Sequence, residues 1–347
     1  MEFAKKCTRL AVLVHVSTAY VAGEREGLIH ETPYEMGETL NGVIGLDIEQ
    51  EKRIVDEKLE ELRKESVPEK DARVAMKQLG IERAKIYGWP NTYVFTKAMG
   101  EMVVGALRGA LPVVILRPTI VTSTCREPFP GWAEGVRTVD TLAVGYGTGK
   151  LTCFLGDING IVDLIPADMV VNSMMVGMTA QAGRPGQSIY QVGTSSRNPV
   201  RYVNLQEVGL RYFRAHPYVN KQGKEVKVGK VTVLKSMSSF QRYMSLRYLF
   251  WLKGLEFVNA ALCRSLEGTY SDLDKKIKFV MRLVELYRPY LFFKGVFDDT
   301  NTEKLWAAVR ENDMAEAEIF YFDPESVDWE EYLMKVHMPG LVKHVFK

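Results

Sequence analysis

The sequence predicts an α/β fold in which a partial parallel sheet is followed by a mainly helical C-terminal region. Its 347 residues, 46% hydrophobic and 10% aromatic, are enough to bury one large or two modest cores. Two short apolar runs, Leu10–Val16 and Leu111–Leu116, have the composition of buried parallel strands. Helical patterns lie between them, and the order strand, helix, strand indicates a parallel crossover.

Three helices are expected between these strands. Residues Glu49–Lys64 and Ala72–Ala84 are rich in charge but repeat apolar residues at helical spacing, which is typical of exposed amphipathic helices. The third helix, Thr92–Gly105, follows Pro90 and contains no proline itself.

After residue 121 the composition of the chain changes, first to a segment rich in glycine and proline and later to one rich in charged and aromatic residues. Gly and Pro are frequent from residue 122 to residue 149, which predicts a long loop that forms a lid or a pocket wall. Asp163–Asp168 leads into an apolar helix, Met169–Ala182, and from Arg201 onward charged and aromatic residues mix in helical periods. We therefore place a boundary near residue 200, between domains 1–200 and 201–347.

Composition and charge exclude several classes of protein. A formal net charge of +2 provides no single-signed field, so we expect no nucleic-acid partner. The cysteines and histidines show none of the spacings of zinc sites or disulfide frameworks, so we expect no metal and a reducing, intracellular compartment. These residues include Cys7, Cys125, Cys153, Cys263, His15, His216 and His337. His15 lies inside the first apolar run, and we interpret it as a satisfied core histidine.

The longest strongly apolar stretch is Leu246–Cys263. It contains Arg247, Lys253 and Glu256, and each charge would cost roughly 2.5 to 3.5 kcal/mol at the centre of a membrane, so we expect no transmembrane segment. Two interpretations remain, a core helix and a helix on a membrane surface, and we favour the core helix.

A Tyr-x-x-x-Lys pattern is suited to proton donation. The four-residue spacing places both side chains on one helical face, where an ammonium lowers the pKa of a phenol from roughly 10. The chain has three matches, Tyr93–Lys97, Tyr146–Lys150 and Tyr290–Lys294. We favour the first as a catalytic pair, because it alone lies on an expected helix between two parallel strands. Glycines interrupt the second, which we predict to be a loop, and bulky apolar residues surround the third.

Hydroxyl residues follow the first predicted strand. Ser17 and Thr18 come directly after Val16, at the polar end of the apolar run. A hydroxyl there donates a second hydrogen bond to a developing oxyanion if Tyr93 is the proton donor, and we prefer Thr18, or failing it Ser17, for this role. Without the tyrosine, a simple turn at the strand end explains both residues.

Several ordered strings resemble the plant alcohol-forming fatty acyl-CoA reductases, from Phe3 to the end of the chain. They are His15-Val-Ser-Thr-Ala-Tyr-Val21, Tyr93-Val-Phe-Thr-Lys97, Leu116-Arg-Pro-Thr-Ile120, Gly131-Trp-Ala-Glu-Gly135, Asp163-Leu-Ile-Pro-Ala-Asp168 and Phe292-Phe-Lys-Gly-Val-Phe-Asp-Asp-Thr-Asn301. The segment from about residue 275 to 347 resembles the C-terminal "male sterility" domain of that family.

The resemblance implies a Rossmann-type sheet, the cofactor NADPH, and reduction of a long-chain acyl-CoA through an aldehyde to a primary alcohol. Tyr93 matches the family's proton donor, Lys97 its partner on the nicotinamide ribose, and Thr18 or Ser17 the third, hydroxyl-bearing member. We also expect cofactor contacts from Arg117, Pro118 and Thr119. Candidate walls for the acyl chain or pantetheine are Phe129, Trp132 and Tyr146.

One departure from that pattern is large. The sequence contains no Gly-x-x-Gly-x-x-Gly turn between a strand and a helix, which would hold the pyrophosphate, so we expect that the N-terminal phosphate-binding half of the sheet is lacking. Weak cofactor binding and an unpaired strand edge at Leu10–Val16 are then expected.

Two hypotheses stay open: an active reductase making precursors of wax, cuticle, suberin or pollen-wall lipid, and a non-catalytic relative that binds acyl chains or pairs with a full-length reductase. A third, a reductase of a sugar nucleotide or sterol, leaves the C-terminal strings unexplained. Peripheral attachment to the endoplasmic reticulum or a plastid is compatible with the first two.

Overall fold

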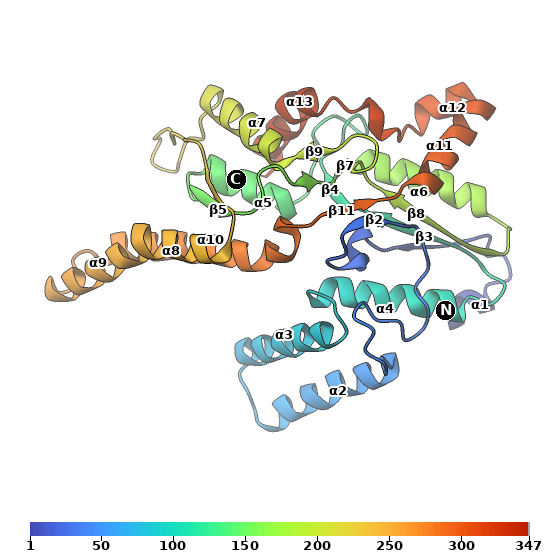
Figure 1. Ribbon diagram of the computed structural model, residues 1–347, viewed down its shortest axis with the longest axis horizontal. Coiled ribbons are helices and arrows are strands. Elements are labelled where there is room, and N and C mark those ends of the chain that lie inside the picture. The colour runs from blue at the N-terminus through green and yellow to red at the C-terminus, as the bar shows by residue number, and fades with distance from the viewer. Residues whose placement is uncertain (346–347) are drawn as a thin grey trace. The chain divides into compact units, whose positions relative to one another are not determined.

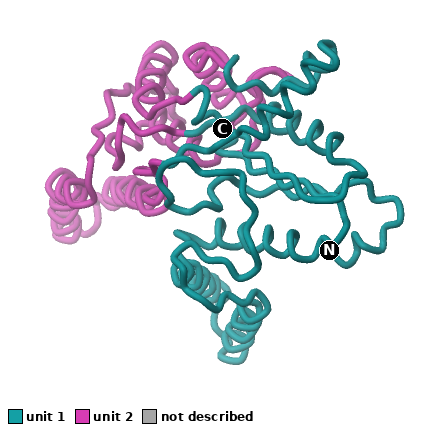
Figure 2. The backbone as a smooth tube through the Cα atoms, turned by 45° about the vertical axis from the view of Figure 1, so that its right-hand side comes forward, with its two compact units in different colours: residues 1–121, 163–198, 295–326 teal, residues 122–162, 199–294, 327–347 magenta. Residues whose placement is uncertain are grey.

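A computed structural model of the chain describes residues 1–345. The chain forms two compact units, each built from three separate segments (Figure 2). Unit 1 comprises residues 1–121, 163–198 and 295–326, and unit 2 comprises 122–162, 199–294 and the segment from 327 onward. One passage between units, after Asn198, lies near the predicted boundary at residue 200. The return of the chain to unit 1 at residue 295 has no compositional signal.

Unit 1 contains the main sheet and the helices around it (Figure 1). Its elements are α1 (Glu2–Lys6), β1 (Leu13–Val16), the 3-10 helix η1 (Ala19–Ala22), β2 (Gly27–Ile29), α2 (Ile48–Lys64), α3 (Glu69–Ile86), α4 (Thr92–Leu107), β3 (Pro112–Pro118), β4 (Ile120–Thr122, ending where unit 2 begins), β7 (Leu164–Pro166), α6 (Ala167–Gln181), β8 (Gly186–Val192), β11 (Gly295–Phe297), α11 (Thr300–Asn312), α12 (Met314–Ile319) and the 3-10 turn η3 (Pro324–Ser326). The three helices expected between the first two strands of the main sheet are confirmed as α2, α3 and α4.

The main sheet is parallel, with strand order β1-β3-β8. Leu13–Val16 pairs with Val113–Leu116, and β3 is buried along its whole length because neighbours cover both of its edges. The expected parallel α/β fold is therefore confirmed. Strand β1 is shorter than the apolar run Leu10–Val16. It lies at one edge of the main sheet, and within residues 1–345 it pairs with β3.

Helices α4 and α6 lie on opposite faces of this sheet (Figure 1). Val104 of α4 packs against Val113 and Ile115 of β3, which buries the apolar side of the helix. The opposite side of α4 joins an aromatic cluster in which Trp89 and Phe95 lie 5.3 Å apart between ring centroids. The helix that carries the predicted Tyr-x-x-x-Lys pair is therefore fixed on both sides.

Unit 2 is mainly helical. Its elements are α5 (Thr138–Gly147), β5 (Cys153–Leu155), β6 (Ile161–Val162), β9 (Val200–Arg201), α7 (Tyr202–Ala215), β10 (Thr232–Leu234), α8 (Met237–Met244), the π-helical turn η2 (Ser245–Leu249), α9 (Phe250–Ala261), α10 (Glu267–Leu291), α13 (Trp329–Glu331), the π-helical turn η4 (Tyr332–His337) and α14 (Met338–His344). Strands β5 and β10 pair in parallel, and β6 and β9 pair antiparallel. The expected helical C-terminal part is confirmed.

Two sequence interpretations in unit 2 need correction. The loop predicted at Tyr146–Lys150 is present only from Thr148 onward. Tyr146 and Gly147 belong to α5, where a Cβ at Gly147 would lie 2.5 Å from the ring of Phe213. The preferred core helix at Leu246–Cys263 is instead exposed along α9, and only part of its surface packs against α10. No helix within residues 1–345 is long and apolar enough to cross a membrane.

Candidate active site

Polar residues meet at the carboxyl ends of the three parallel strands. Ser17 and Thr18 follow β1, Arg117 and Pro118 end β3, and Thr194 follows β8. The register aligns Val16 with Leu116 and Pro118 with Val192, which brings these strand ends to one edge of the sheet. Ligands of parallel α/β sheets bind at this edge.

The two predicted hydroxyls differ in their partners. Thr18 Oγ1 donates to the carbonyl oxygen of Pro118 at 3.3 Å and accepts from the amide of Tyr20 at 3.4 Å, so it holds β1 to β3 and caps η1. Ser17 is also buried, but its Oγ has no hydrogen-bond partner among the described residues. A buried hydroxyl without a partner costs free energy, and a catalytic role is one of the explanations for such a group.

Helix α4 carries the predicted pair to the same edge. Asn91 caps the helix by accepting from the amide of Val94 at 3.2 Å. Lys97 Nζ donates to the carbonyl oxygen of Val16 at 3.0 Å, which places the ammonium at the end of β1 next to Ser17. Tyr93 lies one turn earlier and is 57% exposed, and its phenol makes no hydrogen bond within residues 1–345. The ammonium of Lys97 thus lies at the backbone of the residue before Ser17, and the phenol of Tyr93 is open.

His15 is not the satisfied core histidine expected from the sequence. Its Nε2 is buried and has no hydrogen-bond partner in the part of the chain described. The neighbour on α4 is Gly100, where a Cβ would lie 3.5 Å from this nitrogen. Burial lowers the pKa of His15, and Glu101 and Lys97 act on it in opposite directions. The imidazole therefore favours its neutral form beside the ammonium of Lys97.

Arg117, predicted to contact the cofactor, directs its side chain into the protein. The side chains of Arg117 and Glu101 are only 3% and 1% exposed, and Nη2 and Oε2 lie 2.6 Å apart. The guanidinium also donates to the carbonyl oxygen of Thr32 at 2.9 Å and lies 5.4 Å from the ring centroid of Tyr34. Arg117 therefore joins α4 to the end of β3.

The other two predicted cofactor residues also make contacts within the protein. The carbonyl of Pro118 accepts from Thr18, and the amide of Thr119 donates to the carbonyl of Val192 at 3.0 Å. Both contacts hold neighbouring strand ends in register.

Asp163 is a site residue to which the sequence analysis assigned no role. Its carboxylate is buried and accepts from the amides of Thr194 at 2.7 Å and Ser195 at 3.1 Å. Burial raises the pKa of Asp163, against the effect of these hydrogen bonds. The Asp163–Asp168 string pointed to this position, but only the fold identifies its partners, which lie about thirty residues later and form the loop after β8.

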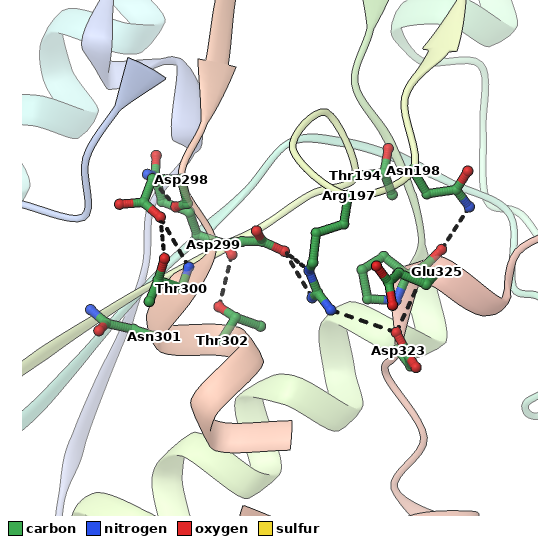
Figure 3. A network of polar contacts seen from close by, with 12 residues as sticks. Thr194, Arg197, Asn198, Asp298, Asp299, Thr300, Asn301, Thr302, Asp323 and Glu325 are labelled. Atoms are coloured by element: carbon green, nitrogen blue, oxygen red, sulfur yellow. Dashed lines mark hydrogen bonds and ion pairs between the residues drawn. The ribbon is translucent and has the colours of Figure 1, made fainter. Parts of the chain in front are cut away.

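A second network attaches the segment 295–326 to the sheet (Figure 3). Arg197 lies 2.8 Å from Asp299 and 3.7 Å from Asp323, and Thr302 donates to the carbonyl of Gln191 at 2.8 Å. Glu31 accepts from the amides of Gln191 and Asn301, both at 2.7 Å, and burial raises its pKa to about 7. The Phe292–Asn301 string therefore stabilises β8, whose end belongs to the candidate site.

The predicted substrate walls belong to unit 2, whereas the catalytic candidates belong to unit 1. Phe129 and Trp132 lie on one loop, held by Thr124, whose Oγ1 donates to the carbonyl of Phe129 and accepts from the amide of Trp132. Tyr146 does not lie on that loop. It is buried on α5, donates to the carbonyl of Gly229 at 2.9 Å and packs edge-on against Phe213.

Comparison with known proteins identifies the family. Two family descriptions match, both termed male sterility protein: an NAD-binding family over residues 1–174 and the Sterile family over residues 234–347. The chain is 50% identical to the alcohol-forming fatty acyl-CoA reductase of Simmondsia chinensis, over 99% of this chain and 70% of that protein. The chain belongs to the fatty acyl-CoA reductase family. This confirms the resemblance found in the sequence, and the Sterile match begins upstream of the residue 275 expected there.

A second relative is also a fatty acyl-CoA reductase by name. Fatty acyl-CoA reductase 1 of Arabidopsis thaliana is 50% identical over all of this chain and 70% of its own length. Among solved structures, the terminal R domain of the myxalamid PKS-NRPS pathway is 18% identical, with a TM-score of 0.47, over 97% of this chain and 59% of that one.

Proposed function

We propose that this reductase converts a long-chain fatty acyl-CoA to the primary alcohol through an aldehyde, with NADPH as the reductant. The observation that carries the proposal is the position of the Lys97 ammonium, 3.0 Å from the carbonyl oxygen of Val16, the residue that precedes the buried and unpartnered Ser17. The residue types and the strand edge on which they lie are those that hydride transfer to a carbonyl requires.

The residues at this edge fit the nicotinamide ribose of the cofactor. An ammonium has three N–H donors, and Val16 accepts one of them, so Lys97 keeps donors for ribose hydroxyls. The exposed phenol of Tyr93 remains available to substrate. When bound, NADPH supplies hydride to the carbonyl carbon. Arg117, Pro118 and Thr119 act in this proposal by fixing the edge, since their observed contacts are within the protein.

The chain's own groups act on the oxygen of the substrate. Addition of the first hydride to the thioester carbon gives a hemithioacetal oxyanion, which Tyr93 and Ser17 stabilise by donating hydrogen bonds. Collapse of this oxyanion breaks the carbon–sulfur bond and releases CoA thiolate and the aldehyde. In the second reduction Tyr93 gives its proton to the alkoxide, and Lys97 favours the resulting phenolate. We propose Ser17 ahead of Thr18, whose hydroxyl already has two partners.

Alcohol formation tests the proposal. The chain is incubated with NADPH and a series of acyl-CoA chain lengths, and primary alcohol is measured by gas chromatography. Tyr93→Phe and Lys97→Met are expected to lower kcat by about 100-fold or more, the usual loss when a general acid is removed. Tyr290→Phe, in another Tyr-x-x-x-Lys match, is the matched control and retains activity. Full activity of Tyr93→Phe contradicts the assigned role.

A non-catalytic relative is the second candidate function. In this alternative the chain binds acyl groups or pairs with a full-length reductase. Gel filtration of the chain mixed with an intact family member, together with the activity of that mixture, tests it. Separate elution and unchanged activity contradict pairing.

The acyl chain and the setting of the reaction extend the proposal. Phe129 and Trp132 are proposed to contact the acyl chain or pantetheine, with Tyr146 stabilising unit 2 behind them. The products would serve wax, cuticle, suberin or pollen-wall lipid. Such substrates and products partition into membranes, so we place the enzyme at an intracellular membrane surface, that of the endoplasmic reticulum or a plastid.

A further inference from the structure

Six large apolar side chains are exposed along one short segment of unit 2. Between 48% and 78% of the surface of each is accessible: Leu246, Phe250, Trp251, Phe257, Val258 and Leu262. Single exposed apolar residues are ordinary, but a contiguous group that includes three aromatic rings marks an interaction surface. We call these six residues the α9 face.

The α9 face belongs to an ordered helix. Phe240 and Met244 of α8 are almost fully buried, and the chain continues through η2 into α9 as one helical run. One side of α9 packs against α10, beside which it runs (Figure 1). Asn259, buried on that side, accepts from the amide of Leu266 at 2.9 Å and donates to Glu267 at 2.8 Å. The turn between the two helices is therefore fixed, and the apolar face stays outside.

Positive charge is in excess along the segment that carries this face. Residues 235–266 contain five cationic side chains and one acidic side chain, Glu256. All five are exposed and have no ion-pair partner among residues 1–345: Lys235, Arg242, Arg247, Lys253 and Arg264. Cationic side chains beside Trp, Phe and Leu are the composition of helices that lie in the interface of an anionic bilayer.

We propose that the α9 face docks onto an anionic phospholipid bilayer and lies within its interface. The aromatic rings enter the boundary between headgroups and acyl chains, and the cations contact lipid phosphate and carboxylate groups. Arg247, Lys253 and Glu256 prevent the segment from crossing the hydrocarbon core. A second copy of this chain fits less well as an occupant, because its matching face would bring five more cations against these five.

This inference adds an attachment surface to the proposed reductase, at a place that the catalytic residues do not use. Its test contains neither NADPH nor acyl-CoA, so failure of membrane docking and failure of the reductase proposal are distinguishable.

Vesicle flotation measures the docking. The full chain is mixed with vesicles of phosphatidylcholine alone or with 30% phosphatidylserine, the latter expected to bind at least about tenfold more tightly. The variant Phe250→Ser/Trp251→Ser/Phe257→Ser is expected to lower binding to the anionic vesicles at least about 100-fold. The matched control, Ile44→Ser/Val74→Ser/Ile319→Ser, removes three exposed apolar side chains elsewhere and keeps binding. Equal loss in both variants, or no preference for anionic lipid, overturns the proposal.

Fluorescence locates the contact. Lipids brominated on the acyl chain quench tryptophan that enters the bilayer, and this quenching is expected in the wild type and absent in Trp251→Phe, which still floats with vesicles. Quenching that persists in Trp251→Phe overturns the assignment of the α9 face. So does a dimer without lipid that the triple serine variant converts to a monomer, because the face would then be an interface between copies.

Discussion

Replacing Arg117 with methionine is expected to lower the free energy of unfolding by about 3–5 kcal/mol. The reason is the carboxylate of Glu101, which would remain 1% exposed with no cation beside it. Methionine fills much of the volume of the arginine stem, so the loss reports mainly on charge. The hydrogen bond from Arg117 to the carbonyl of Thr32, worth about 1 kcal/mol net, is lost as well.

The double variant Arg117→Met/Glu101→Leu separates the charge from the packing. With both charges removed, the buried site becomes apolar, and the expected stability returns to within about 1–2 kcal/mol of the wild type. The coupling between the two positions is then at least about 2 kcal/mol. Urea unfolding followed by fluorescence, with the two single variants and the double variant compared, measures it. A single variant that loses less than 1 kcal/mol, or a double variant no more stable than Arg117→Met, would refute this reasoning.

The same variants decide how Arg117 serves the site. If it acts only by holding the end of β3, the double variant recovers its stability and its KM for NADPH together. If the guanidinium contacts the cofactor, stability recovers but the KM for NADPH stays raised.

Substitutions at three further positions test other buried groups. The pKa of Glu31 rises from 4.5 to about 7 on folding, so the folded enzyme holds a proton that the unfolded chain releases. Stability therefore falls as pH rises from about 4.5 to 7, and Glu31→Gln flattens this part of the curve of urea midpoint against pH; an unchanged slope contradicts the assignment. Asp163→Ala leaves two amides after β8 without an acceptor, with an expected cost of about 2–4 kcal/mol, whereas Asp163→Asn keeps one acceptor and loses about half as much in thermal unfolding. His337→Phe removes the imidazole whose Nε2 lies 3.2 Å from Oδ1 of the buried Asp140, and it is expected to lower the free energy of unfolding by about 2–4 kcal/mol in urea unfolding. A variant as stable as the wild type would show that the carboxylate of Asp140 does not need this imidazole.

Local patterns were sufficient for the elements around the site. Helices α2, α3 and α4 and strand β3 follow from residues close together in the sequence, because the periodicity of apolar side chains depends on neighbours within a few positions. The Tyr93–Lys97 spacing is of the same kind, since four residues span about one helical turn. The sequence also contains enough ordered strings to identify the family.

Patterns were insufficient where an apolar run has two possible environments. The segment from Leu246 to Leu262 is as hydrophobic as a core helix, but hydrophobicity does not specify what covers a surface. Here α10 packs against one side of α9, and the six residues of the α9 face remain exposed. The glycines of α5 show the converse. A glycine such as Gly147 is usually taken as the end of a helix. In the structure Gly147 belongs to α5, because the ring of Phe213, far away in the sequence, leaves no room for a side chain there.

The sequence by itself determined the fold class and the family, and it predicts the pair at residues 93 and 97. Only the tertiary structure decided which polar groups at the sheet edge are already used. Thr18 and Arg117 are held by Pro118 and Glu101, whereas Ser17 is not, and Glu31 binds an amide 270 residues away in the chain. The physical reason is that a buried polar group must find its partner in space, and spacing along the chain does not specify a partner that the fold brings from a distant segment.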